Sequence, residues 1–376
     1  MRIHRRDALS QALAAFAGTL CAASWRGPEA AARENDSSVP PAADDAAAVN
    51  GAAAAEVPSL DWPHIIFQAP PAAPRERSPV ITAVSLHPRE PILAAGGDDH
   101  MVYLWHIDRR ELLRTLRGHA DWVQAVVFSP NGEWLATAGN DKHVLFWNTA
   151  TGESVYAFSD PRHVVTDLAW SHDGALIAAT GFENRLRVYD AVSRQLKHDW
   201  ACPCRDMRVV AWSPDDRWLA AAGRDGVARV WNATSGTHEF DYRAHRQRVR
   251  GLAFSPDGNY IATTGEDRIV HIHGVEADDE GFDLPMQNTK VLSLAFFGPH
   301  HLATGGADNR VRLWNLREQR EIGRLKGPRG SIAALACRDQ WLAAGCFDTT
   351  VRLWTMADQV ASTPEETERA AVRTSR

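Results

Sequence analysis

The sequence predicts an all-β protein built from seven copies of one small antiparallel sheet. The first observation is a repeat in which an acidic residue is followed, six positions later, by a residue with a ring side chain. The second is turn chemistry: apolar stretches end in Ser-Pro-Asn-Gly, Ser-Pro-Asp-Asp or Ser-Pro-Asp-Gly, and these residue types favour tight turns. The seven repeats are Asp99–Trp105, Asp141–Trp147, Glu183–Tyr189, Asp225–Trp231, Asp267–His273, Asp308–Trp314 and Asp348–Trp354.

The spacing of these repeats indicates a structural period. Successive ring residues, from Trp105 to Trp354, lie 42, 42, 42, 42, 41 and 40 residues apart. A constant period of about 20–50 residues is typical of architectures in which each repeat is one supersecondary unit packed against its neighbours. The 14 Trp residues of the chain also indicate regular use of this side chain.

Each repeat contains four strand patterns, which the second repeat illustrates. "WVQAVVF" alternates apolar residues and ends in the Ser-Pro-Asn-Gly turn; "EWLATAG" and "HVLFWN" follow, and "ESVYAF" lies beyond a Thr-Gly turn. Short strands joined by tight turns pair with their sequence neighbours in the antiparallel direction. Four such strands make one blade, and the chain has seven.

Short motifs give residues 61–357 a resemblance to the WD-repeat family of β-propellers. The motifs are Gly118-His119 before a first strand, and Trp147-Asn148, Tyr189-Asp190 and Trp231-Asn232 at the end of third strands. The resemblance implies a seven-bladed β-propeller of four-stranded antiparallel blades. Blade 5 departs from the pattern because His273 stands where Trp is usual.

The resemblance also implies a structural role for the acidic residues. In blade 2 it suggests a buried chain of hydrogen bonds from Trp147 through Thr137 and His119 to Asp141, because a buried carboxylate needs partners. Blade 5 keeps three corresponding residues, His245, Thr263 and Asp267. We therefore interpret the His-Asp-Thr set as structural and not as a catalytic triad. The other blades keep only the acid and the ring residue, and we expect packing to hold them.

Blade 7 needs a fourth strand from elsewhere in the chain. After Trp354 the sequence "TMADQVASTPEE" is a poor strand, whereas "HIIFQ" at residues 64–68 is short, apolar and unassigned. We predict that this N-terminal strand closes the ring as the outer strand of blade 7. A closed ring leaves only short, protected edges.

The N-terminal residues 1–26 have the layout of an export signal. Basic residues around Arg5-Arg6 precede an Ala-rich apolar stretch, which is too short and too weakly apolar for a stable membrane span. The Arg pair resembles a bacterial twin-arginine signal. We expect a periplasmic protein, with a disordered cytoplasmic leader as the alternative. Residues 27–60 are predicted to be a disordered Ala/Pro/Asp-rich linker, and residues 358–376 a flexible tail.

No motif in the sequence predicts an enzyme. There is no phosphate-binding Walker loop, nucleophile elbow, zinc-protease motif or calcium loop, so we expect no catalytic residue, no cofactor and no metal. His271 and His273 could form a metal pair, although His273 occupies the usual Trp position and a core role is favoured. Cys202-Pro203-Cys204 is either a metal or redox site or two thiols in a loop. The alternative function is a ligand, cofactor or catalytic site in the central channel, but first strands such as "SIAALA" are small and apolar there.

The resemblance implies that partners bind the face where the first strands begin. On that face we expect a non-catalytic, monomeric scaffold to bind a protein partner, with an acidic partner favoured by a cationic sector in blades 4–6. Asp206 and Glu266 also occupy positions on that face. A net charge of −6 does not favour nucleic acid. The alternative is a scattered, solvated rim. The candidate partner-binding residues are Trp122, Phe182, Arg208, Arg224, Arg248, Arg250, Lys290 and Phe347.

Overall fold

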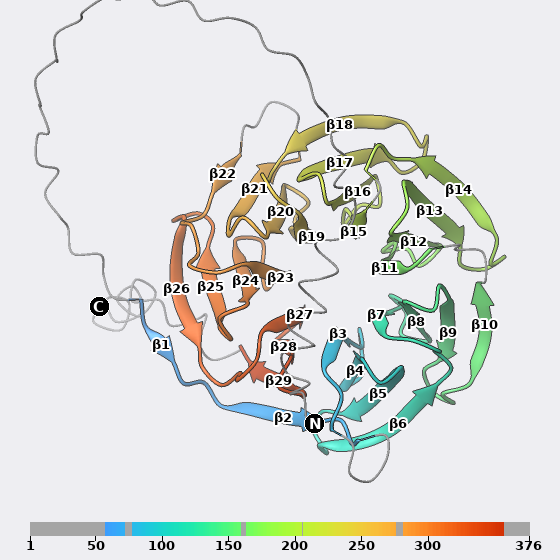
Figure 1. Ribbon diagram of the computed structural model, residues 1–376, viewed down its shortest axis with the longest axis horizontal. Coiled ribbons are helices and arrows are strands. Elements are labelled where there is room, and N and C mark those ends of the chain that lie inside the picture. Colours follow the sequence, from blue (N-terminus) through green and yellow to red (C-terminus); the bar gives the residue numbers. More distant parts are fainter. Residues whose placement is uncertain (1–56, 72–76, 159–162, 205, 276–280, 357–376) are drawn as a thin grey trace, which may run out of the picture. The chain divides into compact units, whose positions relative to one another are not determined.

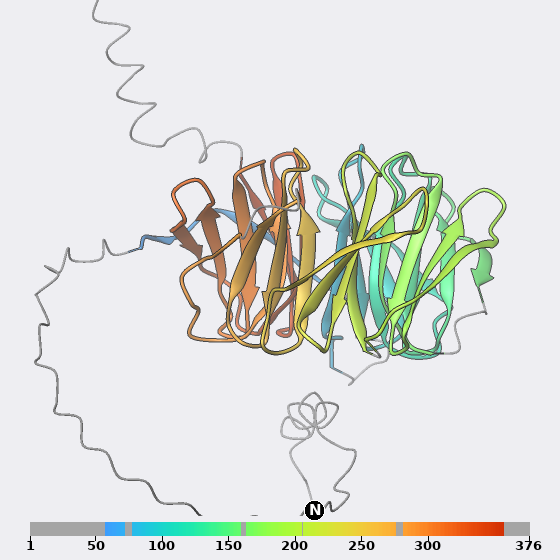
Figure 2. The ribbon, with the colours of Figure 1, turned by 90° about the horizontal axis from the view of Figure 1, so that it is seen from above.

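The computed structural model describes residues 57–71, 77–158, 163–204, 206–275 and 281–356. Within these ranges the regular elements are strands β1–β29, which form seven sheets around a common centre (Figure 1). Figure 2 shows the strands of each sheet running between the two faces of the ring. The predicted all-β, seven-bladed propeller of four-stranded antiparallel blades is confirmed. The predicted segments 1–26 and 358–376, and residues 27–56 of the predicted linker, lie outside the described residues.

Six blades use four strands that are consecutive in the sequence. Blade 1 contains β3 (Ile81–Leu86), β4 (Ile92–Gly97), β5 (Met101–His106) and β6 (Glu111–Arg117). Blade 2 contains β7 (Val123–Phe128), β8 (Trp134–Gly139), β9 (Val144–Asn148) and β10 (Ser154–Phe158). Blade 3 contains β11 (Val165–Trp170), β12 (Leu176–Gly181), β13 (Arg185–Asp190) and β14 (Leu196–Ala201).

The next blades repeat this order. Blade 4 contains β15 (Met207–Trp212), β16 (Trp218–Gly223), β17 (Val227–Asn232) and β18 (His238–Arg243). Blade 5 contains β19 (Val249–Phe254), β20 (Tyr260–Gly265), β21 (Val270–Gly274) and β22 (Phe282–Asp283). Blade 6 contains β23 (Val291–Phe296), β24 (His301–Gly306), β25 (Val311–Asn315) and β26 (Arg320–Leu325). In every blade the first strand lies nearest the centre of the ring (Figure 1).

Blade 7 combines the two ends of the propeller. It contains β27 (Ile332–Arg338), β28 (Trp341–Cys346) and β29 (Thr350–Thr355), and its outer strand is β2 (His64–Gln68). β2 pairs antiparallel with β29, with His64 opposite Trp354 and Gln68 opposite Thr350. Phe67 of β2 is buried, and its ring centroid lies 5.9 Å from that of Trp105 in blade 1. The predicted closing strand is therefore confirmed.

Blade 6 has a fifth strand that the sequence did not predict. β1 (Ser59–Leu60) pairs parallel with the outer edge of β26, although residues 57–60 belong to the predicted linker. A Cβ atom at Gly323 of β26 would lie 2.4 Å from Leu60 Cδ1, so the missing side chain makes room for Leu60. The segment before blade 1 thus follows the rim past blade 6 into blade 7 (Figure 1).

Small residues on the second strands let the blades pack closely. In β4, a Cβ at Gly96 would lie 2.6 Å from Val123 Cγ1 of blade 2. At the equivalent place in β28, a Cβ at Gly345 would lie 2.7 Å from Ile81 Cγ2 of blade 1. Real Cβ atoms do not approach this closely, and protein interiors have no spare volume to absorb the clash. The core is therefore a series of seams between neighbouring blades.

The predicted hydrogen-bond chain of blade 2 is present. Trp147 Nε1 donates to Thr137 Oγ1 at 2.9 Å, and His119 Nε2 lies 2.7 Å from the same oxygen. His119 Nδ1 donates to Asp141 Oδ2 at 2.8 Å, because the carboxylate can only accept. Burial alone would raise the pKa of Asp141, but the hydrogen bond and attraction from His119 lower it overall.

Blade 5 forms the corresponding bonds without Trp. His245 lies 3.0 Å from Thr263 Oγ1 and 2.9 Å from Asp267 Oδ1. His273 is buried at the Trp position, and its ring stacks on Tyr242 with centroids 4.2 Å apart. The core role favoured for His273 agrees with this position.

In the other blades the acid of the repeat has side-chain partners that the sequence analysis did not name. In blades 3, 4, 6 and 7 the acid of the repeat forms an ion pair with an Arg four residues later, on the third strand. In blade 1, Tyr103 Oη donates to Asp99 Oδ2 at 2.5 Å. The four ion pairs are Glu183–Arg187, Asp225–Arg229, Asp308–Arg312 and Asp348–Arg352. We call these four arginines the third-strand arginines.

Candidate functional site

Four cationic side chains gather where the first strands of blades 4, 5 and 6 begin. Arg208 is the second residue of β15, and Arg250 is the second residue of β19. Arg248 comes just before β19, and Lys290 just before β23. Since the first strands are the innermost ones (Figure 1), the ring brings side chains that lie about 40 residues apart in the sequence to one place near its centre.

Two carboxylates connect these cations across the blades. Asp206 pairs with Arg208 (Oδ1 to Nε, 2.7 Å) and with a guanidinium nitrogen of Arg248 (3.1 Å). Glu266 accepts from Lys290 Nζ at 2.9 Å and lies 3.3 Å from Arg248 and 3.7 Å from Arg250. We call these six residues the cationic cluster: Asp206, Arg208, Arg248, Arg250, Glu266 and Lys290. Four cations face two carboxylates, so the cluster carries an excess of two positive charges.

The arginine side chains of the cationic cluster are largely shielded from solvent. Exposed fractions of the side chains are 11% for Arg248, 18% for Arg208 and 28% for Arg250, against 53% for Lys290. Burial lowers the pKa of Arg250, and repulsion from Arg208 lowers it further. Burial alone would raise the pKa of Glu266, but the hydrogen bond from Lys290 and the attraction of Arg250 lower it. Ordered, partly desolvated guanidinium groups in excess are suited to accept an added anion.

One predicted aromatic residue joins the cluster. The guanidinium carbon of Arg208 lies 4.3 Å from the ring centroid of Phe182, which follows β12 in blade 3. This distance is typical of a cation–π contact. Trp122 precedes β7 in blade 2 and Phe347 follows β28 in blade 7, so both lie outside the cluster. Arg224 is exposed after β16, and its backbone N–H donates to the backbone oxygen of Asp206 at 2.9 Å.

Sequence reasoning did not expect the two carboxylates to neutralise half of the cluster. A signal for Asp206 was available, because Asp206 and Arg208 are two residues apart and therefore share one face of a strand. The repeat position of Glu266 placed it on the same face, but did not indicate which cations it would contact. It comes from the turn before Asp267 and meets Arg250 and Lys290 only because neighbouring blades pack side by side.

The other candidate positions form no ligand site in the structure. No group of three or more His, Cys, Asp or Glu residues among those described could hold a metal ion. His271 pairs with Asp283 at 2.7 Å, whereas His273 stacks on Tyr242. Cys202 and Cys204 are buried and form no disulfide, and burial raises the pKa of Cys202 to about 11. No helix in the described part of the chain has the length and hydropathy to span a membrane.

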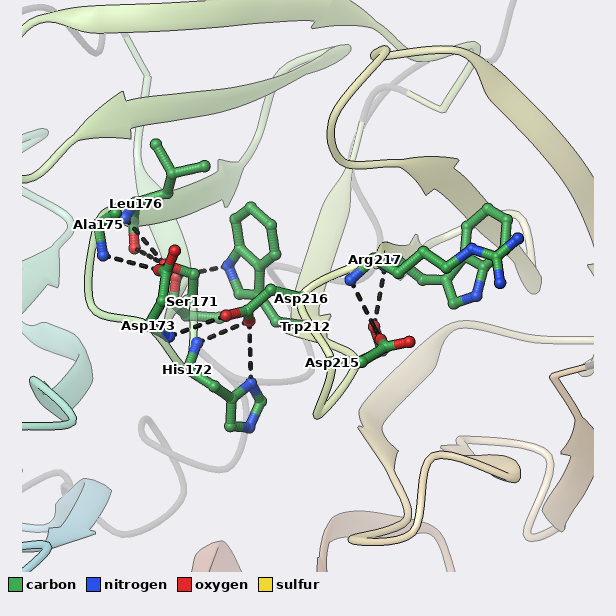
Figure 3. A network of polar contacts seen from close by, with 12 residues as sticks. Ser171, His172, Asp173, Ala175, Leu176, Trp212, Asp215, Asp216 and Arg217 are labelled. Carbon is green, nitrogen blue, oxygen red and sulfur yellow. Dashed lines mark hydrogen bonds and ion pairs between the residues drawn. The ribbon is translucent and has the colours of Figure 1, made fainter.

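A second polar network joins blades 3 and 4 at the turns that follow their first strands (Figure 3). The carboxylate of Asp216 accepts from the backbone N–H groups of His172 and Asp173, and it also contacts the ring of His172. Ser171 and Asp173 satisfy each other within their own turn. Since Asp216 binds two backbone N–H groups of the neighbouring turn, we interpret this network as a structural clamp between blades.

The seven-bladed arrangement agrees with a comparison of the chain with family sequences. The sequence model described as the IFT122 first beta-propeller matches residues 80–355. The chain belongs to this family. The matched range covers the described strands from β3 to β29, so this member of the IFT122 first beta-propeller family is a propeller of the WD-repeat type.

Curated relatives are similar over much shorter stretches. Mitochondrial division protein 1 of Schizosaccharomyces pombe is 39% identical over 59 residues, which are 16% of this chain and 9% of that protein. The proteins of the same name from Neurospora crassa and Pyricularia oryzae are 38% identical over 63 residues and 41% identical over 56 residues. Those matches cover 16% and 15% of this chain, and 10% and 8% of the relatives. The matched stretches thus span a tenth or less of each relative.

Proposed function

We propose that this propeller is a non-catalytic scaffold that binds a protein partner through the cationic cluster. The observation that carries the proposal is the excess of two positive charges held by Arg208, Arg248, Arg250 and Lys290 around Asp206 and Glu266. The partner would supply carboxylate groups, because a carboxylate can accept two parallel hydrogen bonds from one guanidinium.

The geometry supports binding without rearrangement. Asp206 and Glu266 hold the arginines in place, and Phe182 supports the guanidinium of Arg208. An incoming carboxylate therefore does not have to order flexible side chains, which is a main cost of association. Each charge-assisted hydrogen bond adds about 1.5–3 kcal/mol of stabilisation. Arg224, exposed beside the cluster, extends the surface available to the partner.

Charge reversal of Arg250 tests this proposal. Wild-type and Arg250→Glu proteins would be used to capture partners from the native host, with the captured proteins identified by mass spectrometry. Arg243→Glu, on the exposed outer strand β18, is the matched control because it changes the net charge equally away from the cluster. We expect R250E to lose a specific partner that the wild type and R243E both retain. Equal capture by all three folded proteins would place the binding surface elsewhere.

We also propose that the chain is exported to the bacterial periplasm. The support is the basic and then Ala-rich pattern of residues 1–26, including Arg5-Arg6. Cell fractionation with N-terminal sequencing of the mature protein tests this. A periplasmic protein that begins after residue 20 or so agrees with export, whereas an intact cytoplasmic chain contradicts it.

A further inference from the structure

The closing strand is held by a histidine that must be neutral. His64 begins β2, and its Nε2 lies 2.9 Å from NH1 of the third-strand arginine Arg352. A guanidinium only donates hydrogen bonds, so Nε2 of His64 must be unprotonated and accept. The other ring nitrogen, Nδ1, lies 3.2 Å from the backbone oxygen of Trp62. It therefore carries the ring proton and donates.

The other third-strand arginines meet an acid in this place. Glu321 of blade 6 occupies the position that corresponds to His64. Glu321 lies opposite Trp314 in blade 6, and His64 lies opposite Trp354 in blade 7. Arg312 Nε lies 3.7 Å from Glu321 Oε1. In blades 3 and 4 the outer-strand residues Asp199 and Asp241 each lie 3.8 Å from their arginine. Among blades 3, 4, 6 and 7, blade 7 thus differs from the others. The outer-strand partner of its arginine is the neutral His64 and not a carboxylate.

Few charges are available to compensate a proton on His64. Arg352 is 8% exposed, and among the described residues it forms an ion pair with Asp348 at 3.4 Å. The ring of His64 packs 5.7 Å from that of Trp354, and Gly327 lies so close that a Cβ there would be 3.2 Å from Nε2. The adjoining segments also carry Asp61, Lys326 and Arg329, which are exposed; the backbone N–H of Arg329 donates to Asp348 at 2.8 Å.

We propose that β2 is an acid-released closing strand. Protonation of His64 removes the acceptor for Arg352 and brings a second positive charge against it, so β2 leaves β29 and the ring loses its closure. Histidine is the side chain whose charge changes between about pH 5 and pH 8. The released strand leaves His64 free to take up a proton. Release is therefore favoured as the pH falls, and closure is favoured as it rises.

Hydrogen exchange of the full chain tests the release directly. Amide exchange in residues 64–68 would be measured by mass spectrometry at about pH 7.5 and about pH 5.5, after correction for the pH dependence of chemical exchange. Strand β6, which forms the outer edge of blade 1 and contains no histidine, is the internal reference. We expect exchange in residues 64–68 to become roughly tenfold faster at the lower pH relative to β6.

Three variants distinguish release of β2 through His64 from a general loosening of the propeller in acid. His64→Glu copies Glu321 of blade 6, and His64→Gln keeps an acceptor that does not titrate. His300→Gln is the matched control, because His300 Nε2 accepts from Arg317 at 2.7 Å in an exposed contact away from β2. We expect H64E and H64Q to lose the acid-induced exchange and H300Q to keep it. If H64E fails to fold, H64Q decides. The proposal is overturned if the wild type shows no acid-induced exchange in this segment, or if H64Q shows the same increase. Neither result bears on the partner site, which does not involve β2.

Discussion

Asp216 binds His172 of the neighbouring blade with one carboxylate oxygen and the adjacent Asp173 with the other. Oδ1 accepts from the backbone N–H of His172 at 2.6 Å and lies 3.1 Å from the ring nitrogen Nδ1, while Oδ2 accepts from Asp173 N at 2.8 Å. The seams on either side have Pro in place of His172 and Gly in place of Asp216. Pro214 contacts Gly258 in this way between blades 4 and 5. Asp216 therefore replaces a glycine, and it keeps the left-handed backbone with a φ of 56°.

Two substitutions of Asp216 should separate the stability that its hydrogen bonds contribute from the cost of its left-handed backbone. We expect Asp216→Ala to lower the free energy of unfolding by about 2–3 kcal/mol, because it removes charge-assisted hydrogen bonds and keeps a strained φ. Asp216→Gly relieves the strain and should cost about 1 kcal/mol less. Urea unfolding measures both. Equal stability of D216A and the wild type would mean that the clamp contributes nothing.

Asp167 should make the stability fall as the pH rises. Burial raises the pKa of this carboxyl from its ordinary value of 3.8 to about 7, although Val210 N and Leu168 N donate to it. Between these two values the native state binds more protons than the unfolded chain, so the free energy of unfolding decreases with pH through this window. Asp167→Asn should remove that decrease, because the amide does not titrate, although it can accept from only one of the two N–H groups. Urea titrations at about pH 5 and about pH 8 provide the measurement; parallel pH slopes of D167N and the wild type would contradict it.

The third-strand arginines should stabilise their blades. The side chain of Arg312 is 6% exposed and pairs with Asp308 at 2.5 Å and with Glu321 at 3.7 Å. We expect Arg312→Met to cost about 2–4 kcal/mol, because two partly buried acids lose a partner. Arg324→Met is the control: Arg324 is 34% exposed and also contacts Glu321, so its loss should cost under about 1 kcal/mol. Similar losses in thermal or urea unfolding would show that burial of the pair is unimportant.

Gly345 should be essential for the seam between blade 7 and blade 1. A Cβ there would lie 2.7 Å from Ile81 Cγ2 and 2.9 Å from Val84 Cγ1. Gly345→Ala should therefore destabilise the protein by about 1–3 kcal/mol through overpacking. In an Ile81→Ala background the same change should cost less, because the clashing methyl group is gone. A double-mutant cycle with equal costs in the two backgrounds would rule out this contact as the cause.

The repeat made most of the fold predictable from the sequence. Each blade is a local unit with its own turns, so the position of Trp147 in one repeat locates Trp231 in another. Residues 64–68 were assignable because blade 7 lacked a strand. β1 was not, since two residues cannot show alternation and its pairing depends on the absent side chain of Gly323.

The side-chain networks were predictable only where a known motif contained them. The chain from Trp147 to Asp141 followed from the family resemblance, whereas the pairing of Asp308 with Arg312 has no counterpart in that motif. Of the candidate site, the cations and Phe182 were found by their repeat positions. Their partial neutralisation by Glu266 depends on contacts between blades, which a single repeat does not reveal.

The pairing of β2 with β29 has a consequence for biosynthesis. His64 and Arg352 are separated by 288 residues, so β2, one of the first strands to leave the ribosome, must wait for the last one. At ordinary translation rates of about 5–20 residues per second this delay is roughly 15–60 s. During that time "HIIFQ" is an unpartnered apolar segment in the nascent chain, which makes it the natural point for a chaperone to engage.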